Sequence, residues 1–93
     1  MPYITQNDRY KFDVALIALP RIETAGELNY LITQLARKYI LDHGLRYEHI
    51  NAIRGALVCV GDEFYRRVIA PYEDKKIAEN GDVYTMYKPG QCQ

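Results

Sequence analysis

The sequence predicts an all-α protein: a small helical bundle of three main helices plus a short fourth helix, assembled as an oligomer. Three observations support this fold class. Two segments start with a capping-box pattern, long stretches carry apolar residues at helical spacing, and proline or glycine stands where those stretches end. The 93 residues suit one domain, 1–93, with a flexible tail from about residue 82. Because so short a chain buries little surface, we expect it to self-associate.

The first expected helix begins at the sequence TQND, residues 5–8. The pattern fits a capping box in which the Thr5 hydroxyl accepts from an early backbone amide and Asp8 reaches back. Pro20 is expected to close the segment, because proline interrupts the helical hydrogen bonds. Apolar residues recur between these limits at helical spacing: Phe12, Leu16 and Leu19.

The second expected helix begins at a second capping box, TAGE at residues 24–27, and ends before Gly44. Glycine at that position favours a left-handed helix cap. An amphipathic stripe runs between the two signals. It consists of Leu28, Leu31, Ile32, Leu35 and Tyr39. Asn29 and Tyr30 fall outside the centre of this stripe, so they need another partner.

The third expected helix, from about Tyr47 to Ala70, carries a coiled-coil-like row of apolar residues that we call the apolar seam. Gly55 and Gly61 lie inside this helix and each costs about 1 kcal/mol relative to alanine. Such glycines are tolerable where another helix crosses closely. The apolar seam consists of Ile50, Ile53, Leu57, Val60, Phe64 and Val68.

Two alternatives remain open for Pro71. It either ends or kinks the third helix, or occupies the first turn of a short fourth helix over Tyr72–Glu79. Asn80-Gly81 is expected to stop that helix. The weak alternation in DVYTMY, residues 82–87, is typical of a short extended tail that could pair with the tail of another subunit.

Composition limits the classes of function. Twelve basic and twelve acidic residues give a formal net charge of zero, which disfavours general nucleic-acid binding because that affinity depends on neutralising phosphates. No apolar run approaches the roughly 20 residues that cross a bilayer, and the first residues lack the features of a signal peptide. We therefore expect no membrane partner and a cytoplasmic location.

Metal and cofactor chemistry finds little support. His43 and His49 lie six residues apart without a third ligand at metal spacing, so a zinc site is not expected. Cys59 and Cys92 are too few for a disulfide scaffold. We predict no metal, no cofactor and no catalytic residues.

Three motifs carry a resemblance that spans nearly the whole chain. They are PYI at residues 2–4, GELNY at 26–30 and FYRRVIAPYEDKKIAENGDVY at 64–84. With these motifs the chain resembles a family of small phage and bacterial proteins of unknown function. The resemblance implies a phage or prophage context within a bacterial host, and it carries no activity over to this chain.

The long motif concentrates rings and charges beyond what a core needs. Together with the two carboxylates that directly precede it, the motif predicts a salt-bridged helix face, with Asp62–Arg66 and Glu63–Arg67 pairs at i,i+4. No sequence signature of a nucleophile is present, so a small enzyme ranks third among the functional hypotheses.

The same motif predicts a ligand site. One of two adjacent arginines can serve an internal ion pair while the other offers its planar fork to a phosphate, and tyrosine rings can stack on a base. The predicted ligand-binding residues are Asn29, Tyr30, Tyr65, Arg66, Arg67, Tyr72 and Lys76.

The leading functional hypothesis is therefore a non-enzymatic, phage-type binding protein. It would sequester a small nucleotide-like immune signal, such as a cyclic nucleotide or an ADP-ribose derivative. The alternative is a protein–protein interaction module that inhibits or modifies a host factor, or a virion accessory protein. Tyr and Arg are also enriched in such interfaces, so the same residues would serve. Expected partners are a second copy, a small nucleotide-like ligand and a host protein.

Overall fold

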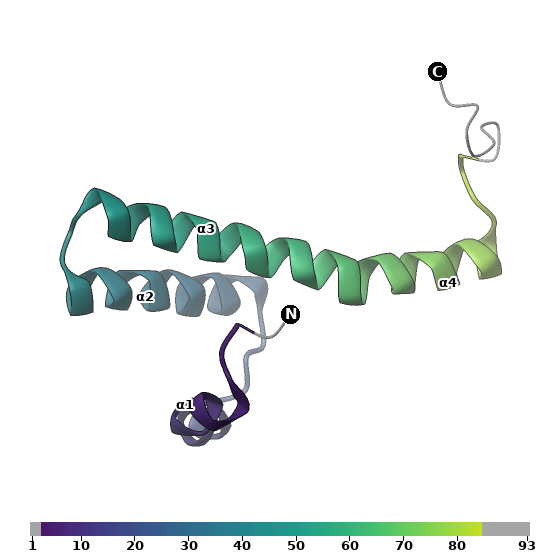
Figure 1. The fold of residues 1–93 in the computed structure, drawn as a ribbon. Coiled ribbons are helices and arrows are strands. Elements are labelled where there is room, and N and C mark those ends of the chain that lie inside the picture. The colour runs from purple at the N-terminus through teal and green to yellow at the C-terminus, as the bar shows by residue number, and fades with distance from the viewer. Residues whose placement is uncertain (1–2, 85–93) are drawn as a thin grey trace. The chain divides into compact units, whose positions relative to one another are not determined.

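The computed structural model describes residues 3–84, whose regular structure is entirely helical (Figure 1). The predicted all-α class is confirmed. The elements are α1 (Gln6–Ala18), α2 (Ala25–His43), α3 (Tyr47–Phe64), the π-helical turn η1 (Tyr65–Ile69) and α4 (Ala70–Asn80). The chain divides into two compact units, residues 1–38 and 39–93, with the boundary inside α2.

Helix α1 starts at Gln6 with Thr5 as its N-cap, the position that the capping-box pattern predicts. The capping interaction differs from the predicted one. The Thr5 hydroxyl donates to Oδ2 of Asp8 at 2.9 Å and makes no hydrogen bond to a backbone amide. The anionic carboxylate is the stronger acceptor for this hydroxyl. The helix ends at Ala18, and Leu19 is extended because a residue before proline avoids the helical conformation.

Helix α2 carries the second capping box. The Glu27 amide donates to the Thr24 hydroxyl at 3.0 Å, as expected, while the Glu27 carboxylate accepts from the amide of Glu23 at 2.7 Å. At the other end Gly44 has φ +99° and its amide donates to the Ile40 carbonyl at 2.6 Å. The predicted left-handed glycine cap is thereby confirmed.

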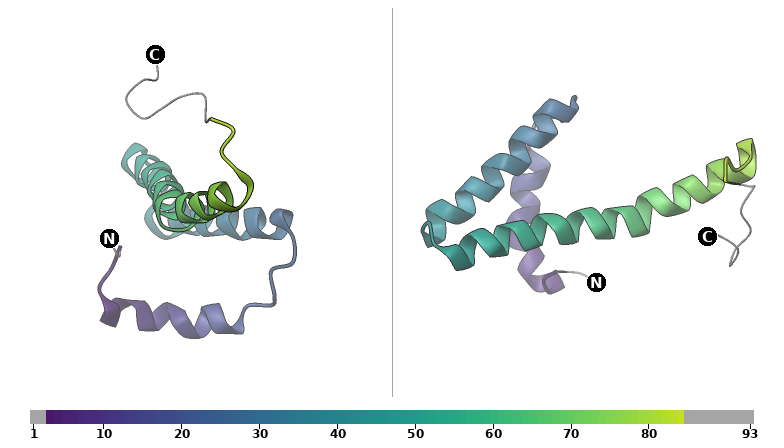
Figure 2. Two further views of the ribbon diagram at one scale, coloured as in Figure 1. Left: turned by 90° about the vertical axis from the view of Figure 1, so that its right-hand side faces the viewer. Right: turned by 90° about the horizontal axis from the view of Figure 1, so that it is seen from above.

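In the second unit α3, η1 and α4 follow one another as a single helix from Tyr47 to Asn80, about 50 Å long (Figure 2). Inside η1 the amide of Ala70 donates to the carbonyl of Tyr65, five residues back. Pro71 explains this turn, because it has no N–H and its ring clashes with the carbonyl four residues earlier. Of the two alternatives for Pro71, the first turn of α4 is the one observed.

The π-helical turn was not predicted, and it changes the limits of the helices. Helix α3 ends at Phe64 instead of near Ala70, and α4 begins two residues before the expected Tyr72. Gly81, with φ +89°, stops α4 as predicted. Residues 82–84 form a turn in place of the expected extended tail, because the Asp82 carboxylate accepts from the Tyr84 amide at 2.9 Å. The rest of that tail lies outside the described residues.

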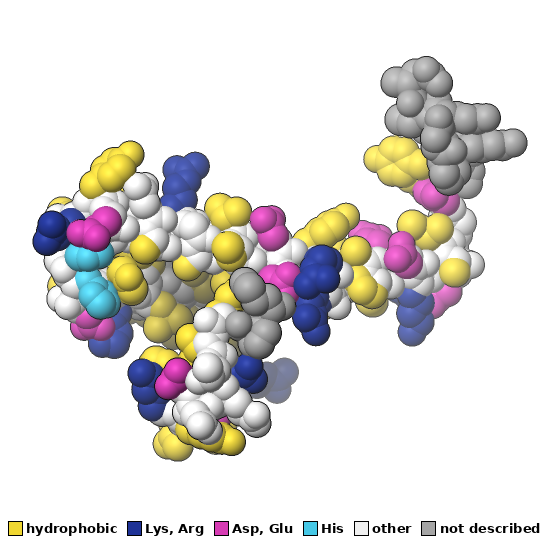
Figure 3. Space-filling model, viewed as in Figure 1, with side chains coloured by type: hydrophobic (Ala, Val, Ile, Leu, Met, Phe, Trp, Pro, Cys, Tyr) yellow, Lys and Arg dark blue, Asp and Glu magenta, His cyan; other side chains and the backbone are white. Residues whose placement is uncertain are grey.

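No side chain among residues 3–84 is buried. The bundle core expected from the sequence is therefore missing from this part of the chain. Residues of the apolar seam are about half exposed, for example Leu57 at 47% and Phe64 at 55%, and hydrophobic side chains are visible along α3 and α4 (Figure 3). No helix in the described range is long and apolar enough to cross a membrane.

Candidate functional site

The seven predicted ligand-binding residues lie in two different units. Asn29 and Tyr30 are on α2 in the first unit. The other five lie close together in sequence in the second unit, three of them on the π-helical turn and two on α4. These five are Tyr65, Arg66, Arg67, Tyr72 and Lys76.

Arg66 is held by a carboxylate one turn earlier on its own helix. Its Nη2 and Nε atoms donate to Oε2 of Glu63 at 2.9 and 3.2 Å. The hydrogen bonds from Arg66, and then its charge, lower the pKa of Glu63 below the ordinary 4.5. The predicted Asp62–Arg66 and Glu63–Arg67 pairs are wrong. Residues three apart are also neighbours on a helix. The Glu63 carboxylate pairs with Arg66 at this i,i+3 spacing.

Arg67 differs from its neighbour. Within residues 3–84 it makes no ion pair and no hydrogen bond through its side chain. Tyr65 and Tyr72 are 57% and 60% exposed. One arginine is thus engaged by its own chain while the other presents its five donors outward. The internal ion pair expected for one of the two arginines is formed by Arg66. Both arginines lie on a π-helical turn, a rare geometry that is frequent at functional sites.

Lys76 interacts within α4 on two sides. Its Nζ atom lies 5.5 Å from the centroid of the Tyr72 ring, a cation–π distance, and 3.3 Å from Oε1 of Glu79. Tyr72 and Lys76 therefore form one local group on α4. The charge of Lys76 is partly compensated by Glu79, so it contributes less positive potential than Arg67.

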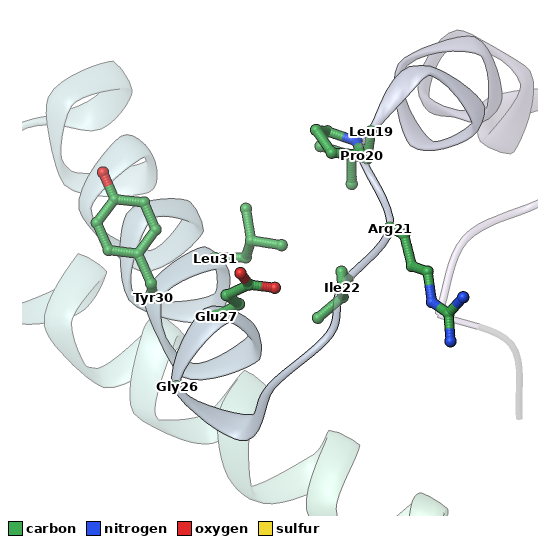
Figure 4. A pocket seen from close by; sticks show the side chains of 8 residues that line it. All are labelled: Leu19, Pro20, Arg21, Ile22, Gly26, Glu27, Tyr30 and Leu31. Atoms are coloured by element: carbon green, nitrogen blue, oxygen red, sulfur yellow. The ribbon is translucent and has the colours of Figure 1, made fainter.

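The first unit contains a shallow hollow of about 370 Å³ between the segment after α1 and the first turns of α2. In Figure 4 Ile22, Glu27 and Leu31 face the hollow, whereas the guanidinium of Arg21 points away from it. Tyr30 contributes to its wall and is 62% exposed; Asn29 does not line it. The lining residues that precede α2 were not predicted as part of a site. The signal in the sequence was Pro20, which marks an irregular segment between two helices.

A second group missed by the sequence analysis lies at the turn between α2 and α3. The rings of Tyr39, His43 and His49 lie near one another, with centroid distances of 4.3, 5.5 and 6.1 Å. His49 Nδ1 is 2.8 Å from the carbonyl oxygen of Gly44; a carbonyl only accepts, so Nδ1 carries the proton. This group closes the turn, and no cluster of three metal-ligating residues occurs within the described range.

A family described as a domain of unknown function (DUF6899) matches residues 1–83. The chain belongs to this family. The DUF6899 match includes α1 to α4, so the hollow of the first unit and the π-helical turn of the second both lie inside the family domain. The resemblance to a family of unknown function seen in the sequence motifs is confirmed. No curated protein and no solved structure matches the chain.

Proposed function

We propose that this DUF6899 protein is a binding module that acts by burying its apolar helix faces against another protein chain. The observation that supports this proposal most strongly is the lack of any buried side chain between residues 3 and 84. Soluble monomers rarely leave large contiguous apolar patches exposed, and such patches mark interaction sites. A chain of this size needs the additional burial that a partner supplies.

The apolar seam is the surface most suited to this role. The seam runs along one continuous helix, so its side chains are regularly spaced. A helical partner could therefore contact the seam over much of its own length. Burying the exposed half of one Val, Leu or Phe side chain contributes about 1 kcal/mol. The charged residues of α3 and α4 stand beside the seam and provide the polar rim that interfaces usually have.

Two valines of α3 give a matched test of this proposal. Val60 belongs to the apolar seam and Val58 does not, yet both are 54% exposed. Val60→Asp should abolish association, measured by sedimentation velocity, because it places a carboxylate in the interface. Val58→Asp should associate like the unsubstituted protein. Equal effects of the two substitutions, or association unaffected by Val60→Asp, would contradict the proposal.

A second candidate function is the capture of a small anionic ligand that contains an aromatic base. In this function the chain would be a phage-type protein that sequesters a nucleotide-like signal. The specific observation in its favour is Arg67, which no residue in the range 3–84 neutralises. An arginine fork recognises phosphate, and the exposed Tyr65 and Tyr72 rings are available for stacking.

Native mass spectrometry with cyclic dinucleotides and ADP-ribose derivatives tests this second candidate. Ligand capture predicts discrete ligand masses on the protein, lost in Arg67→Ala and retained in Arg54→Ala, which removes an arginine from elsewhere on α3. A protein that binds none of these compounds would exclude this ligand class and leave the interaction module as the function.

A further inference from the structure

We infer that the partner covering the apolar seam is a second copy of this chain, lying antiparallel to the first with the two-fold axis passing at Tyr65. The inference rests on the proposed function and names its partner. It is carried by the position of η1 within the seam and by the residues on the two flanks of the seam.

The π-helical turn keeps the seam continuous across the middle of the helix. In an unbroken α-helix the seam spacing after Phe64 would next select residues 67 and 71, Arg67 and Pro71. A π-helical turn accommodates one extra residue, so Val68 and Tyr72 take these positions instead. Apolar residues therefore continue on both sides of Tyr65, with Leu57 and Val60 before it and Val68 and Tyr72 after it.

Charge complementarity on one flank selects the orientation of the partner. Glu63 and Arg67 each directly precede a seam residue, so they share one flank, and they lie two residues before and two after Tyr65. In an antiparallel pair of helices, like flanks face each other. Arg67 of each copy then faces Glu63 of the other, and the two-fold symmetry makes this contact twice. Arg67, unpaired among residues 3–84, thereby gains a carboxylate.

Shape complementarity on the other flank supports the same axis. Gly61 and Ile69 each directly follow a seam residue and lie four residues before and four after Tyr65. The space beside Gly61 is open, since a Cβ atom there would meet no atom within 4 Å. The side chain of Ile69 from the second copy can occupy this space. In a parallel pair, the flank with Glu63 and Arg67 would face the flank with Gly61 and Ile69. Arg67 would then have no carboxylate opposite it.

Farther from the axis, the same register brings Arg54 toward Lys76 of the second copy. These like charges do not oppose the pairing strongly, because Lys76 is already bonded to Glu79 at 3.3 Å. The Glu79 carboxylate lies about one turn from the height of Arg54 and can accept from it. The antiparallel register thus provides a carboxylate close to each arginine on the two flanks.

Disulfide trapping tests the orientation directly. In a background with Cys59→Ser and Cys92→Ser, Leu57→Cys and Tyr72→Cys are made as separate proteins and mixed in a glutathione redox buffer. Leu57 lies eight residues before Tyr65 and Tyr72 seven after it, so we expect the mixed disulfide to dominate. Identical positions would be about 20 Å or more apart along the axis, too far for a disulfide. Disulfides of Leu57→Cys with itself, or no mixed disulfide, would overturn the inference.

Charge exchange gives an independent test that separates this inference from the proposed function. Glu63→Lys and Arg67→Glu should each weaken dimerisation about tenfold or more, because each sets like charges against each other. An equimolar mixture should regain the lost affinity as a heterodimer, since both contacts become complementary again. If the mixture does not regain dimer affinity, the antiparallel register centred on Tyr65 is wrong. This conclusion holds even if Val60→Asp still dissociates the protein. If Val60→Asp also has no effect, the proposed function fails with it.

Discussion

Nη2 of Arg66 lies 2.9 Å from Oε2 of Glu63, one turn earlier on the same helix. This contact separates two adjacent arginines that look equivalent in the sequence. Arg66 pairs with a carboxylate of its own chain, and the contribution of this pair to stability is small because the arginine side chain is 65% exposed. Arg67 makes no side-chain hydrogen bond or ion pair among residues 3–84.

The pKa of Glu63 should depend on Arg66. Hydrogen bonds and charge from Arg66 hold this pKa below 4.5 in the folded protein. Replacing Arg66 by Gln should therefore raise the pKa of Glu63 toward its ordinary value, measured by carboxyl-carbon NMR titration. Arg54→Gln serves as the control and should leave it unchanged. A pKa of Glu63 that does not respond to Arg66→Gln would contradict the observed pairing.

The same shift sets the sign of a pH dependence. A carboxyl whose pKa is lower in the folded state stabilises that state above its unfolded pKa. The contribution is lost as the pH falls below 4.5 and through the folded pKa. Thermal unfolding should therefore show a loss of stability in this acid range that is smaller in Arg66→Gln than in the unsubstituted protein. An identical acid response of both proteins would argue against it.

Arg66→Ala and Arg67→Ala should have different consequences. If two copies meet at Tyr65, Arg67→Ala should weaken dimerisation in sedimentation experiments and also raise the pKa of Glu63, because it removes the guanidinium of the second copy. If Arg67 binds a phosphate, the dimer should persist while ligand binding is lost. Arg66→Ala should affect both properties less, and the reverse order of effects would refute the assignment of roles.

Two glycines should respond in opposite directions to alanine. Gly44 has φ +99°, where a Cβ atom is strained by about 1–2 kcal/mol, so Gly44→Ala should destabilise the protein by about that amount. Gly55 lies inside α3 with open space beside it, so Gly55→Ala should stabilise it by about 1 kcal/mol. Denaturant unfolding measures both. Destabilisation by Gly55→Ala would show that another helix packs closely there.

Pro71→Ala should raise helix stability yet weaken association. Pro71 interrupts the helical hydrogen bonds between α3 and α4, and its removal eliminates the cause of η1. A regular helix would then place Arg67 in the seam in place of Val68. Sedimentation should show a weaker dimer, while circular dichroism shows equal or greater helicity. Gly55→Ala is the control, because it raises helix propensity without changing the seam. Unchanged association in Pro71→Ala would contradict the role given to η1.

The sequence predicted the helices well because their ends carry strong local signals. Thr24 and Glu27 mark the start of α2, Gly44 marks its end, and Gly81 marks the end of α4. Each signal acts through the hydrogen bonds of its own turn, so it does not depend on the rest of the fold.

Features that depend on a choice between near-equal local geometries were not predictable. Pro71 indicated that the helix is interrupted near residue 71. Whether the helix kinks, ends or forms the π-helical turn η1 depends on the relative free energies of these local geometries. Glu63 has two arginines within one turn, Arg66 at i,i+3 and Arg67 at i,i+4. Sequence spacing alone does not decide which of them pairs with it. The group of Tyr39, His43 and His49 required the geometry of the turn at Gly44. The placement of the seven candidate residues as one site remains a prediction.

The concentration dependence of folding tests the central claim most directly. Thermal unfolding is followed by circular dichroism over a wide range of protein concentration, with the oligomeric state measured by sedimentation equilibrium in the same samples. If burial of the apolar seam requires another copy, the Tm should rise with concentration and helicity should fall as the oligomer dissociates. A monomer that unfolds cooperatively at one Tm across the whole range would contradict the account.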